Sequence, residues 1–340
     1  MTSPPRLAVT LFSFTNELLA ADRSPDAMLE GLLRAEPGVA VEIDAAQHFR
    51  SFPLLDADEV RRTAAVIEAA DAGVSLLGGG ADVAPAPGRL LDGREQLAQV
   101  RSQIAAAAIL SAEAVRIPFG VLPWDVLERA ADDARAARVL LVEEVQGPAD
   151  PAGEPIRDRI ADLERTGETA IRLLLDTSAL MSGLPGTYVA ALRAEGVPEA
   201  LVARLGEALA SGRVAPLVLP ALADPALSPA AKALLITAMT RFGASRAASW
   251  LPLAPWIAAV HVKWWDLDSA AGDLGAETGA VIEGLLASGF DGTVCSEWGG
   301  HEWQGIDIAA SAQVPAHLDL LRARFGQRPP TSVQKRHKHC

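Results

Sequence analysis

Short apolar segments alternate with longer amphipathic segments along most of the chain. Each apolar segment ends at turn residues or at a charged residue, a pattern that predicts strands. The predicted strands are Arg6–Phe14, Gly38–Ile43, Ala72–Leu77, Ala114–Phe119, Arg138–Val145, Ala170–Asp176, Ile257–Trp265 and Gly292–Trp298. Their nearly continuous apolar character is typical of a parallel sheet that helices cover.

The amphipathic segments between these strands predict the covering helices. They lie at Asn16–Ala21, Asp58–Ala70, Gly93–Ala108, Trp124–Ala137, Gly153–Thr166, Glu277–Ser288 and His317–Phe325. Strands that alternate with helices predict an α/β fold, and a count of eight favours a closed (β/α)₈ TIM barrel over an open doubly wound sheet. The barrel would form a single domain over residues 1–326, followed by a flexible C-terminal tail at 327–340.

The alternation is interrupted between the sixth and seventh strands. Residues 182–255 show helical patterns separated by Gly and Pro, without a clear strand. About 85 residues separate Asp176 from His261, whereas a βα unit needs only about 30. We therefore expect a mainly helical insertion here, which acts as a lid or as an interface.

Composition and charge narrow the classes of partner. The 340 residues include 30 basic and 43 acidic side chains, and the formal net charge is −13. Such a surface repels phosphate backbones and anionic lipids, so neither nucleic acid nor a membrane is an expected partner. Two cysteines exclude a disulfide framework, and the apolar runs fall far short of the roughly 20 residues that span a bilayer. We expect a cytoplasmic protein.

Ionisable residues stand at the carboxyl ends of four consecutive predicted strands. They are Glu143 with Glu144, Asp176, His261 with Lys263, and Glu297. Active sites of TIM barrels lie at these ends, and an ionisable side chain on an apolar strand is costly to bury unless it is paired or binds a metal. Three carboxylates and one imidazole suit a divalent cation such as Mn²⁺, Mg²⁺ or Co²⁺. Glu143 and Glu144 point to opposite sides of their strand, so only one of them can face the barrel mouth.

Each of these residues also has an ordinary structural explanation. Asp176 precedes Thr177 and Ser178 and is well placed to cap a turn. A single His on an apolar strand is more often a hydrogen-bonded core residue than a ligand. Adjacent glutamates are often surface charges, and tryptophans often fill a core. The metal site is favoured by the succession of one ligand type per strand end.

Five segments resemble the sugar phosphate isomerase/epimerase family, the xylose isomerase-like barrels. They are LAVTLFSFTNEL, VEEVQGP, LLLDTS, VHVKWWD and GFDGTVCSEWGG. In that family a Glu, an Asp, a His and a Glu from strands five to eight bind one divalent metal ion, commonly Mn²⁺. The resemblance implies that the metal ligands are Glu144, Asp176, His261 and Glu297, with Mn²⁺ as first choice and Mg²⁺ or Co²⁺ as alternatives. Glu144 is chosen because the family's Glu-x-His-x-Pro motif aligns with Glu144–Pro148, which puts Gln146 where many members have His.

The same resemblance implies a metal-dependent isomerase or epimerase that acts on a keto-sugar through an enediolate intermediate. Glu144 and Glu297 would form the acid/base pair, and Lys263 would stabilise the developing oxyanion. His301 is a candidate second base. The substrate would contact Gln146, Trp265, Trp298 and Trp303. Because few Lys and Arg residues other than Lys263 lie near the strand ends, a phosphorylated substrate is disfavoured.

Two other functions stay open. The long insertion and the SEWGG end of the eighth strand resemble the catalytic subunit of bacterial C-glycoside deglycosidases, which are carbon–carbon lyases. Those enzymes act on 3-oxo-glycosides by enolisation and elimination and pair with a small second subunit, although Gln146 in place of His argues against this alternative. The third candidate is a non-catalytic sugar-binding subunit. In each case a small sugar or glycoside is the expected partner, and either a homo-oligomer or a small second subunit fits the sequence.

Overall fold

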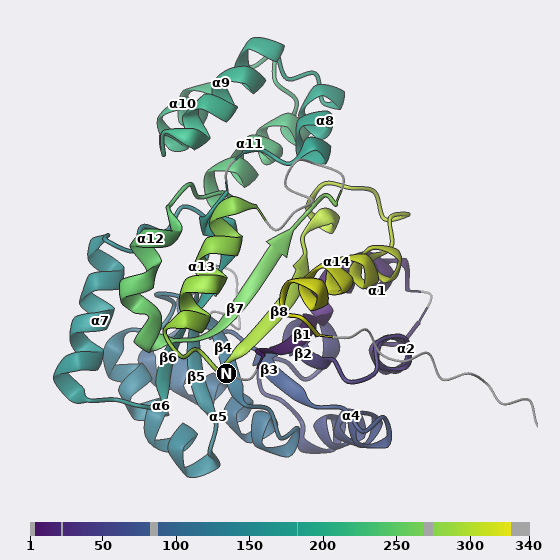
Figure 1. Cartoon of the computed structure of the whole chain (residues 1–340), viewed down its shortest axis with the longest axis vertical. Coiled ribbons are helices and arrows are strands. Elements are labelled where there is room, and N and C mark those ends of the chain that lie inside the picture. The colour runs from purple at the N-terminus through teal and green to yellow at the C-terminus, as the bar shows by residue number, and fades with distance from the viewer. Residues whose placement is uncertain (1–3, 22, 82–87, 182, 268–274, 328–340) are drawn as a thin grey trace, which may run out of the picture.

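The strands of the chain close into a parallel barrel in sequence order. The computed structural model describes residues 4–21, 23–81, 88–181, 183–267 and 275–327. Its strands are β1 (Arg6–Thr10), β2 (Ala40–Asp44), β3 (Val74–Gly78), β4 (Ala114–Pro118), β5 (Leu140–Val145), β6 (Ile171–Asp176), β7 (Ile257–Trp264) and β8 (Thr293–Trp298) (Figure 1). The barrel closes where β8 pairs with β1 in parallel. The predicted TIM barrel is therefore confirmed.

Helices surround the barrel. They are α1 (Thr15–Ala20), α2 (Pro25–Ala35), α3 (Ala45–His48), α4 (Ala57–Ala69), α5 (Gly93–Ile109), α6 (Trp124–Ala137), α7 (Glu154–Thr166), α13 (Ala276–Ala287) and α14 (Ala310–Arg324). Side chains of Ser24, Asp56 and Asp92 accept hydrogen bonds from backbone N–H groups in the first turns of α2, α4 and α5. These caps satisfy groups that a helix start leaves without partners. Among the described residues, no helix combines the length and apolar character needed to cross a bilayer.

The first strand is shorter than predicted. β1 ends at Thr10, and Leu11–Phe14 form a 3₁₀ helix in place of the expected strand. The Thr10 side chain accepts a hydrogen bond from the backbone N–H of Phe12, which starts the turn. Leu11 and Phe14 are buried in the 3₁₀ helix, so the apolar run indicated burial of these side chains but not the backbone conformation.

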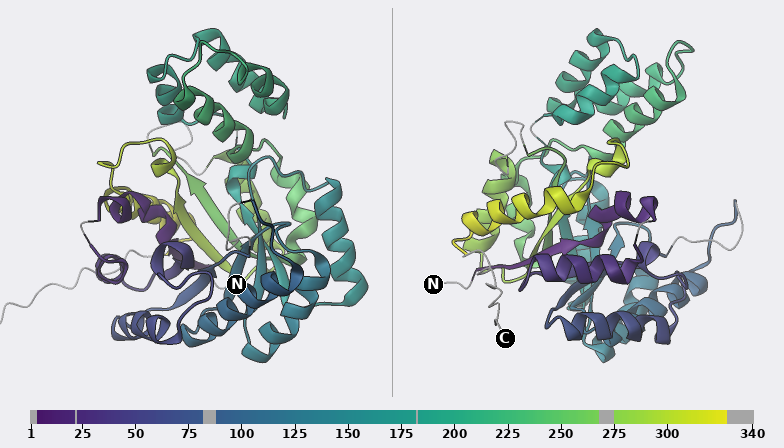
Figure 2. Two further views of the ribbon diagram at one scale, coloured as in Figure 1. Left: turned by 180° about the vertical axis from the view of Figure 1, so that it is seen from behind. Right: turned by 90° about the vertical axis from the view of Figure 1, so that its right-hand side faces the viewer.

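Helices fill the chain between β6 and β7. They are α8 (Gly186–Ala194), α9 (Glu199–Ala210), α10 (Val214–Ala221), α11 (Pro229–Arg241) and α12 (Ala247–Trp250). The first four, called the helical arm below, stand beyond the carboxyl ends of the strands, and Figure 2 shows the same arrangement from two other sides. The arm has a core of its own, to which Trp265 contributes from the barrel. From residue 328 onward, the predicted C-terminal tail lies outside the described residues.

The inside of the barrel is divided into an apolar part and a charged part. Leu76, Ala114, Val142, Leu174 and Ala259 pack together in one interior cluster, and Ala8, Ala40 and Cys295 form another. Two residues further along β6 and β7 the side chains are ionisable. The apolar part of the interior lies toward the amino ends of the strands, and the charged part lies toward their carboxyl ends.

His317 connects α14 to β8 and allows a test of the packing. Its ring stacks on Trp264 with centroids 4.5 Å apart, and Nδ1 lies 2.8 Å from Ser296 Oγ. Burial lowers the pKa of His317 to about 3. The unfolded chain, with an ordinary pKa near 6.5, therefore binds the proton first as the pH falls. The stability that neutral His317 contributes is complete above pH 6.5 and decreases as the pH falls toward 3.

We expect His317 to account for a loss of about 2 kcal/mol in the free energy of unfolding between pH 6.5 and pH 5. Urea unfolding of the wild type and of His317→Gln at pH 7.5 and pH 5 measures this. The variant should lose less stability than the wild type on acidification. Equal losses in the two proteins would show that His317 does not titrate in this way.

Candidate active site

The predicted metal ligands converge inside the mouth of the barrel. Glu144 on β5, Asp176 on β6, His261 on β7 and Glu297 on β8 each offer one ligand-type atom, and these atoms all lie within 4.8 Å of one another. All four residues are buried. In the parallel register Asp176 pairs with His261. The arrangement of three carboxylates and one imidazole can hold a divalent cation.

Glu143 and Glu144 face opposite sides of β5, as strand alternation predicts. Oε2 of Glu143 lies 2.7 Å from Nε of Arg159, which belongs to α7 outside the barrel. Burial raises the pKa of Glu143 to about 7, although Arg159 opposes this. Only Glu144 faces the interior, where it meets His261.

Asp176 both caps a turn and faces the cluster. Its Oδ1 accepts a hydrogen bond of 2.7 Å from the backbone N–H of Ser178, which is the capping role considered from the sequence. Its Oδ2 is buried without a hydrogen-bond partner. Burial, together with the nearby Glu297, raises the pKa of Asp176 to about 7. A buried carboxylate oxygen without a partner is costly, so this side chain fits a bound cation well.

Opposite charges keep the two glutamates of the cluster ionised. Although burial disfavours the charged forms, Arg116 and His261 hold the pKa of Glu144 below its ordinary value, and Lys263 and His261 do the same for Glu297. Nδ1 of His261 lies 3.0 Å from Glu144 Oε1 and 2.6 Å from Glu297 Oε2. This ring nitrogen therefore faces the other candidate ligands.

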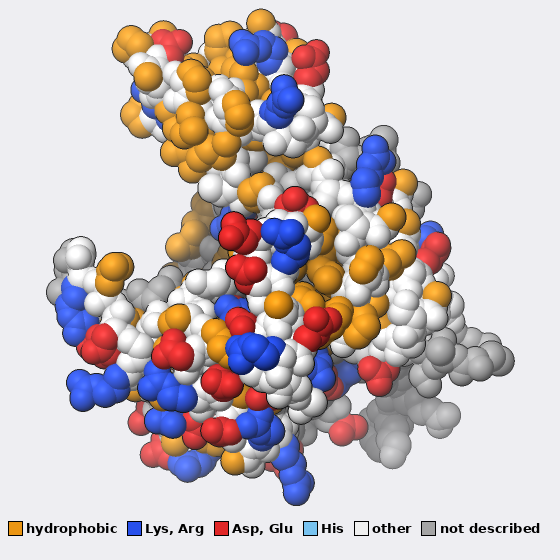
Figure 3. Space-filling view, turned by 90° about the vertical axis from the view of Figure 1, so that its left-hand side faces the viewer, with side chains coloured by type: hydrophobic (Ala, Val, Ile, Leu, Met, Phe, Trp, Pro, Cys, Tyr) orange, Lys and Arg blue, Asp and Glu red, His pale blue; other side chains and the backbone are white. Residues whose placement is uncertain are grey.

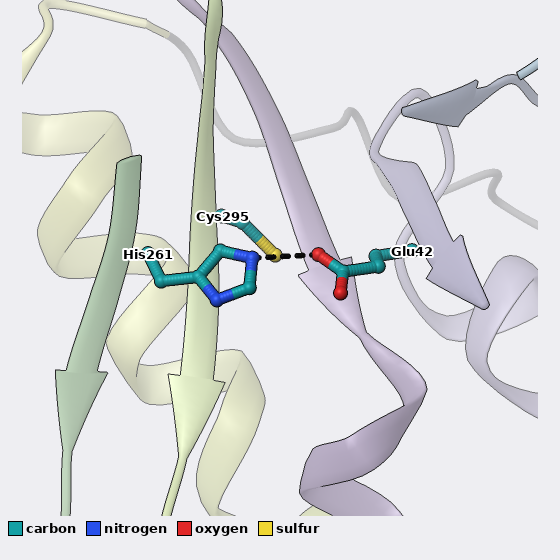
Figure 4. Close-up of side chains that lie close together, drawn as sticks. All are labelled: Glu42, His261 and Cys295. Carbon is teal, nitrogen blue, oxygen red and sulfur yellow. Dashed lines mark hydrogen bonds and ion pairs between the residues drawn. The ribbon is translucent and has the colours of Figure 1, made fainter. Parts of the chain in front are cut away.

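Two charged residues from the first half of the barrel extend the cluster, and neither was predicted from the sequence. Oε2 of Glu42, on β2, lies 2.6 Å from Nε2 of His261 (Figure 4). Arg116, on β4, lies 2.7 Å from Glu42 Oε1 through Nε and 2.7 Å from Glu144 Oε2 through Nη1. Both residues interrupt apolar strand segments, GVAVEI and AVRIPF. An ionisable residue in an apolar strand segment is also the signal that identified the candidate ligands on the later strands.

Gly78 at the end of β3 makes room for Arg116. A Cβ atom at this position would lie 2.5 Å from Nη2 of Arg116 and 3.4 Å from Oε1 of Glu42. A side chain here would displace the guanidinium from its carboxylate partners. The glycine therefore belongs to the same charged arrangement.

Lys263 extends the cluster toward the loop after β8. Its Nζ lies 2.8 Å from Glu297 Oε1 and 3.6 Å from Glu302 Oε1. Burial works against the ammonium form, but Glu297 and Glu302 raise the pKa of Lys263 above its ordinary value. Lys263 thus carries a fixed positive charge beside the cluster.

The helical arm contributes Arg241 to the mouth of the barrel. Nη1 of Arg241, at the end of α11, donates a hydrogen bond of 3.1 Å to Oε1 of Gln146. Its Nε lies 3.4 Å from Glu302 Oε1. Arg116 and Arg241 thus add two cations near the strand ends, where the sequence led us to expect few besides Lys263. No local pattern indicates the position of Arg241, because this residue reaches the site from a distant segment.

Two of the three predicted substrate-contacting tryptophans lie together at the mouth. Trp265 and Trp303 stack with centroids 5.6 Å apart, and Trp265 Nε1 donates a hydrogen bond of 3.2 Å to Glu302 Oε2. Trp298 is placed differently. Trp298 follows Glu297 on β8, so its side chain points to the opposite face of the strand. It is 1% exposed and packs in the core with Trp264. The structure therefore does not bring the ring of Trp298 together with the stacked rings of Trp265 and Trp303 at the mouth.

His301 lies in the short 3₁₀ helix after β8. Its half-buried ring contacts Phe12 edge-on, with centroids 4.7 Å apart. Burial and the positive charge of Lys263 lower the pKa of His301 to about 4. The imidazole is therefore neutral at neutral pH and able to accept a proton.

Comparison with known proteins adds relatives at low identity. No family model matches the chain. It is 24% identical over 336 residues to the 3′-dehydrocarminate deglycosidase alpha subunit of a Microbacterium species, covering 95% of this chain and 96% of the relative. It is 26% identical over 319 residues to the C-glycoside deglycosidase alpha subunit of Microbacterium trichothecenolyticum, covering 88% of this chain and 84% of the relative.

Solved structures with similar folds include sugar epimerases. The 3-keto-D-glucoside 4-epimerase YcjR of E. coli superposes with a TM-score of 0.54 and 12% identity, over 94% of this chain and 99% of that one. The two chains therefore share the closed eight-stranded barrel fold. The D-allulose 3-epimerase of a Methylomonas species gives a TM-score of 0.56 with 12% identity, over 94% and 97%. The IOLI protein with a bound zinc atom gives 0.53 with 11% identity, over 95% and 100%.

Proposed function

We propose that the chain is a divalent-metal-dependent enzyme that removes a proton from the carbon beside a sugar carbonyl. The observation that carries this proposal is the convergence of the candidate ligand atoms of Glu144, Asp176, His261 and Glu297 within 4.8 Å. These residues would hold one ion, with Mn²⁺ as first choice for a set of oxygen and nitrogen ligands and Mg²⁺ or Co²⁺ as alternatives. A bound divalent cation would act as a Lewis acid that makes the neighbouring C–H group more acidic.

The surrounding residues supply the proton transfers. A carboxylate oxygen of Glu144 or Glu297 accepts the proton, because both carboxyls are held in their charged forms. Lys263 donates a hydrogen bond to the sugar oxygen on which negative charge develops. Neutral His301 is the proposed second base. Return of the proton to the adjacent carbon would isomerise the sugar, and return to the opposite face would epimerise it.

We further propose that the substrate is a 3-oxo-glycoside and that the proton removal leads to elimination. The proton on carbon 2 goes to the carboxylate, its electron pair forms the bond between carbons 1 and 2, and the aglycone leaves with the electrons of its bond to carbon 1 and takes up a proton. Similarity to deglycosidase alpha subunits along nearly the whole chain supports this outcome. The stacked Trp265 and Trp303 would suit an aromatic aglycone.

The second candidate is an isomerase or epimerase of free keto-sugars, which the structural neighbours favour. Both candidates begin with the same proton removal, so incubation with a panel of 3-oxo-glycosides and ketoses in D₂O separates them. We expect release of an aglycone from one or more 3-oxo-glycosides. Deuterium incorporation without release would instead establish the isomerase or epimerase. A chain that holds no divalent ion and catalyses neither reaction would be a non-catalytic sugar-binding subunit.

We also propose that the helical arm binds a small second subunit. Leu219 is 57% exposed and Ile236 is 42% exposed, and between them only Asp224 and Lys232 are charged. Hydrophobic side chains gather on this arm in Figure 3. The relatives described above are named alpha subunits, which agrees with assembly. Light scattering tests the homo-oligomer alternative, because a dimer that Leu219→Glu converts to a monomer would show that the arm binds a second copy.

A further inference from the structure

The imidazole of His261 contacts carboxylates through both ring nitrogens. Nδ1 faces the proposed metal ligands Glu144 and Glu297. Nε2 faces the opposite way and lies 2.6 Å from Oε2 of Glu42 (Figure 4). Both side chains of this second contact are fully buried, with exposed fractions of 1% for His261 and 0% for Glu42. Glu42 therefore contacts a proposed ligand without belonging to the ligand set.

We propose that Glu42 is a positioning residue that accepts the Nε2–H hydrogen bond of His261 and thereby directs the Nδ1 lone pair toward the metal ion. A neutral imidazole carries one N–H group and one lone pair, so fixing the proton on Nε2 frees Nδ1 to act as a ligand. Metal-binding histidines usually donate their other N–H in this way. The inference rests on the metal centre proposed above.

Arg116 fixes the orientation of the Glu42 carboxylate. Nε of Arg116 contacts Oε1 of Glu42, so each carboxylate oxygen has its own partner, and the plane of the carboxylate is determined from both sides. The same guanidinium contacts Oε2 of Glu144. Arg116, whose side chain is 11% exposed, thus orients both the proposed ligand Glu144 and Glu42, which contacts the ligand His261. Gly78 leaves the space for the guanidinium.

Cys295 offers a competing explanation for Glu42. Its Sγ forms a second group of ligand-type atoms with Glu42 and His261, all within 4.8 Å (Figure 4). The thiol donates a hydrogen bond of 3.6 Å to the backbone carbonyl of Ser296 and packs against Ala8 and Ala40. A second ion held by this group would make Glu42 a ligand, so the stoichiometry of binding separates the two explanations.

The test is Mn²⁺ binding to the full chain, measured by titration calorimetry for the wild type and Glu42→Gln. A glutamine has one acceptor oxygen, and Arg116 needs it, so the amide NH₂ would face His261 and favour the wrong tautomer. We expect one ion per wild-type chain and a 10- to 100-fold higher Kd for the variant, the usual effect of losing such a partner. Neither readout depends on activity.

Matched variants separate this role from a general loss of a buried ion pair. Glu36 is also a buried glutamate that contacts an arginine, with Oε2 at 2.7 Å from Nη2 of Arg322, and it lies outside the cluster. We expect Glu36→Gln and Cys295→Ala to keep the wild-type Kd for Mn²⁺. Nitrogen-15 spectra of histidine in the Zn²⁺-loaded wild type should show that Nε2 of His261 carries the proton, a result that requires no variant to fold.

Three results would overturn the inference. The first is a Kd of Glu42→Gln within about twofold of the wild type, and the second is a proton on Nδ1 of His261 in the Zn²⁺-loaded protein. The third is two Mn²⁺ ions per wild-type chain, one of which is lost in both Glu42→Gln and Cys295→Ala. If the wild type binds no divalent ion at all, the proposed metal centre itself fails, and this outcome is distinct from the other three.

Discussion

Replacing Glu297 with Gln is expected to lower kcat by about 10³-fold while the fold is retained. An amide has nearly the same shape as the carboxylate but cannot accept a proton from the substrate. It also removes the negative charge that contacts Lys263 at 2.8 Å and His261 at 2.6 Å. The assay uses the substrate that the D₂O panel identifies, and circular dichroism checks the fold.

Glu143→Gln is the matched control for this variant. Glu143 is also a buried glutamate on a barrel strand, but its carboxylate contacts Arg159 outside the barrel. We expect Glu143→Gln to keep kcat within a few-fold of the wild type even if its stability falls. Turnover of Glu297→Gln at the wild-type rate would remove Glu297 from the proposed acid/base pair.

Removal of divalent ions by a chelator is expected to lower activity by at least about 100-fold, and addition of Mn²⁺ is expected to restore it. Without an ion, the clustered carboxylates lose the cation that would balance them, and the sugar carbonyl is no longer polarised. An ion present at 100 times its Kd stabilises the folded chain by about 2.7 kcal/mol, so chelation should also lower the melting temperature.

Asp176→Asn tests whether the stabilisation by Mn²⁺ comes from an ion bound at the proposed metal centre. The variant keeps Oδ1 for the hydrogen bond from Ser178 but replaces the oxygen that has no partner. We expect its melting temperature to respond much less to Mn²⁺ than that of the wild type. Full activity of the wild type after exhaustive chelation would contradict the metal-dependent mechanism.

The sequence predicted the barrel and its strand-end cluster because both depend on local patterns. An ionisable residue at the end of an apolar strand is conspicuous, and parallel strands bring such ends together. A broader rule, which also considers ionisable residues inside apolar strand segments, would have identified Glu42 in GVAVEI and Arg116 in AVRIPF. They were missed because their charges lie inside the strand segment rather than at its end.

Other features depended on contacts that no local pattern contains. Arg241 reaches Gln146 from the helical arm, about 95 residues further along the chain. Trp298 points away from the barrel interior because successive side chains of a strand face opposite sides and Glu297 faces inward. Only the aromatic character of Trp298 suggested a contact with substrate. Helix α2 had a readable start, with Ser24 as the cap and Pro25 in the first turn, yet it was not predicted.

Anomalous diffraction from crystals of the Mn²⁺-loaded chain, measured at the manganese edge, would locate an ion held by the proposed metal centre. We expect one strong peak within bonding distance of Glu144, Asp176, His261 and Glu297. A peak beside Cys295 alone, or no peak inside the barrel mouth, would contradict this expectation.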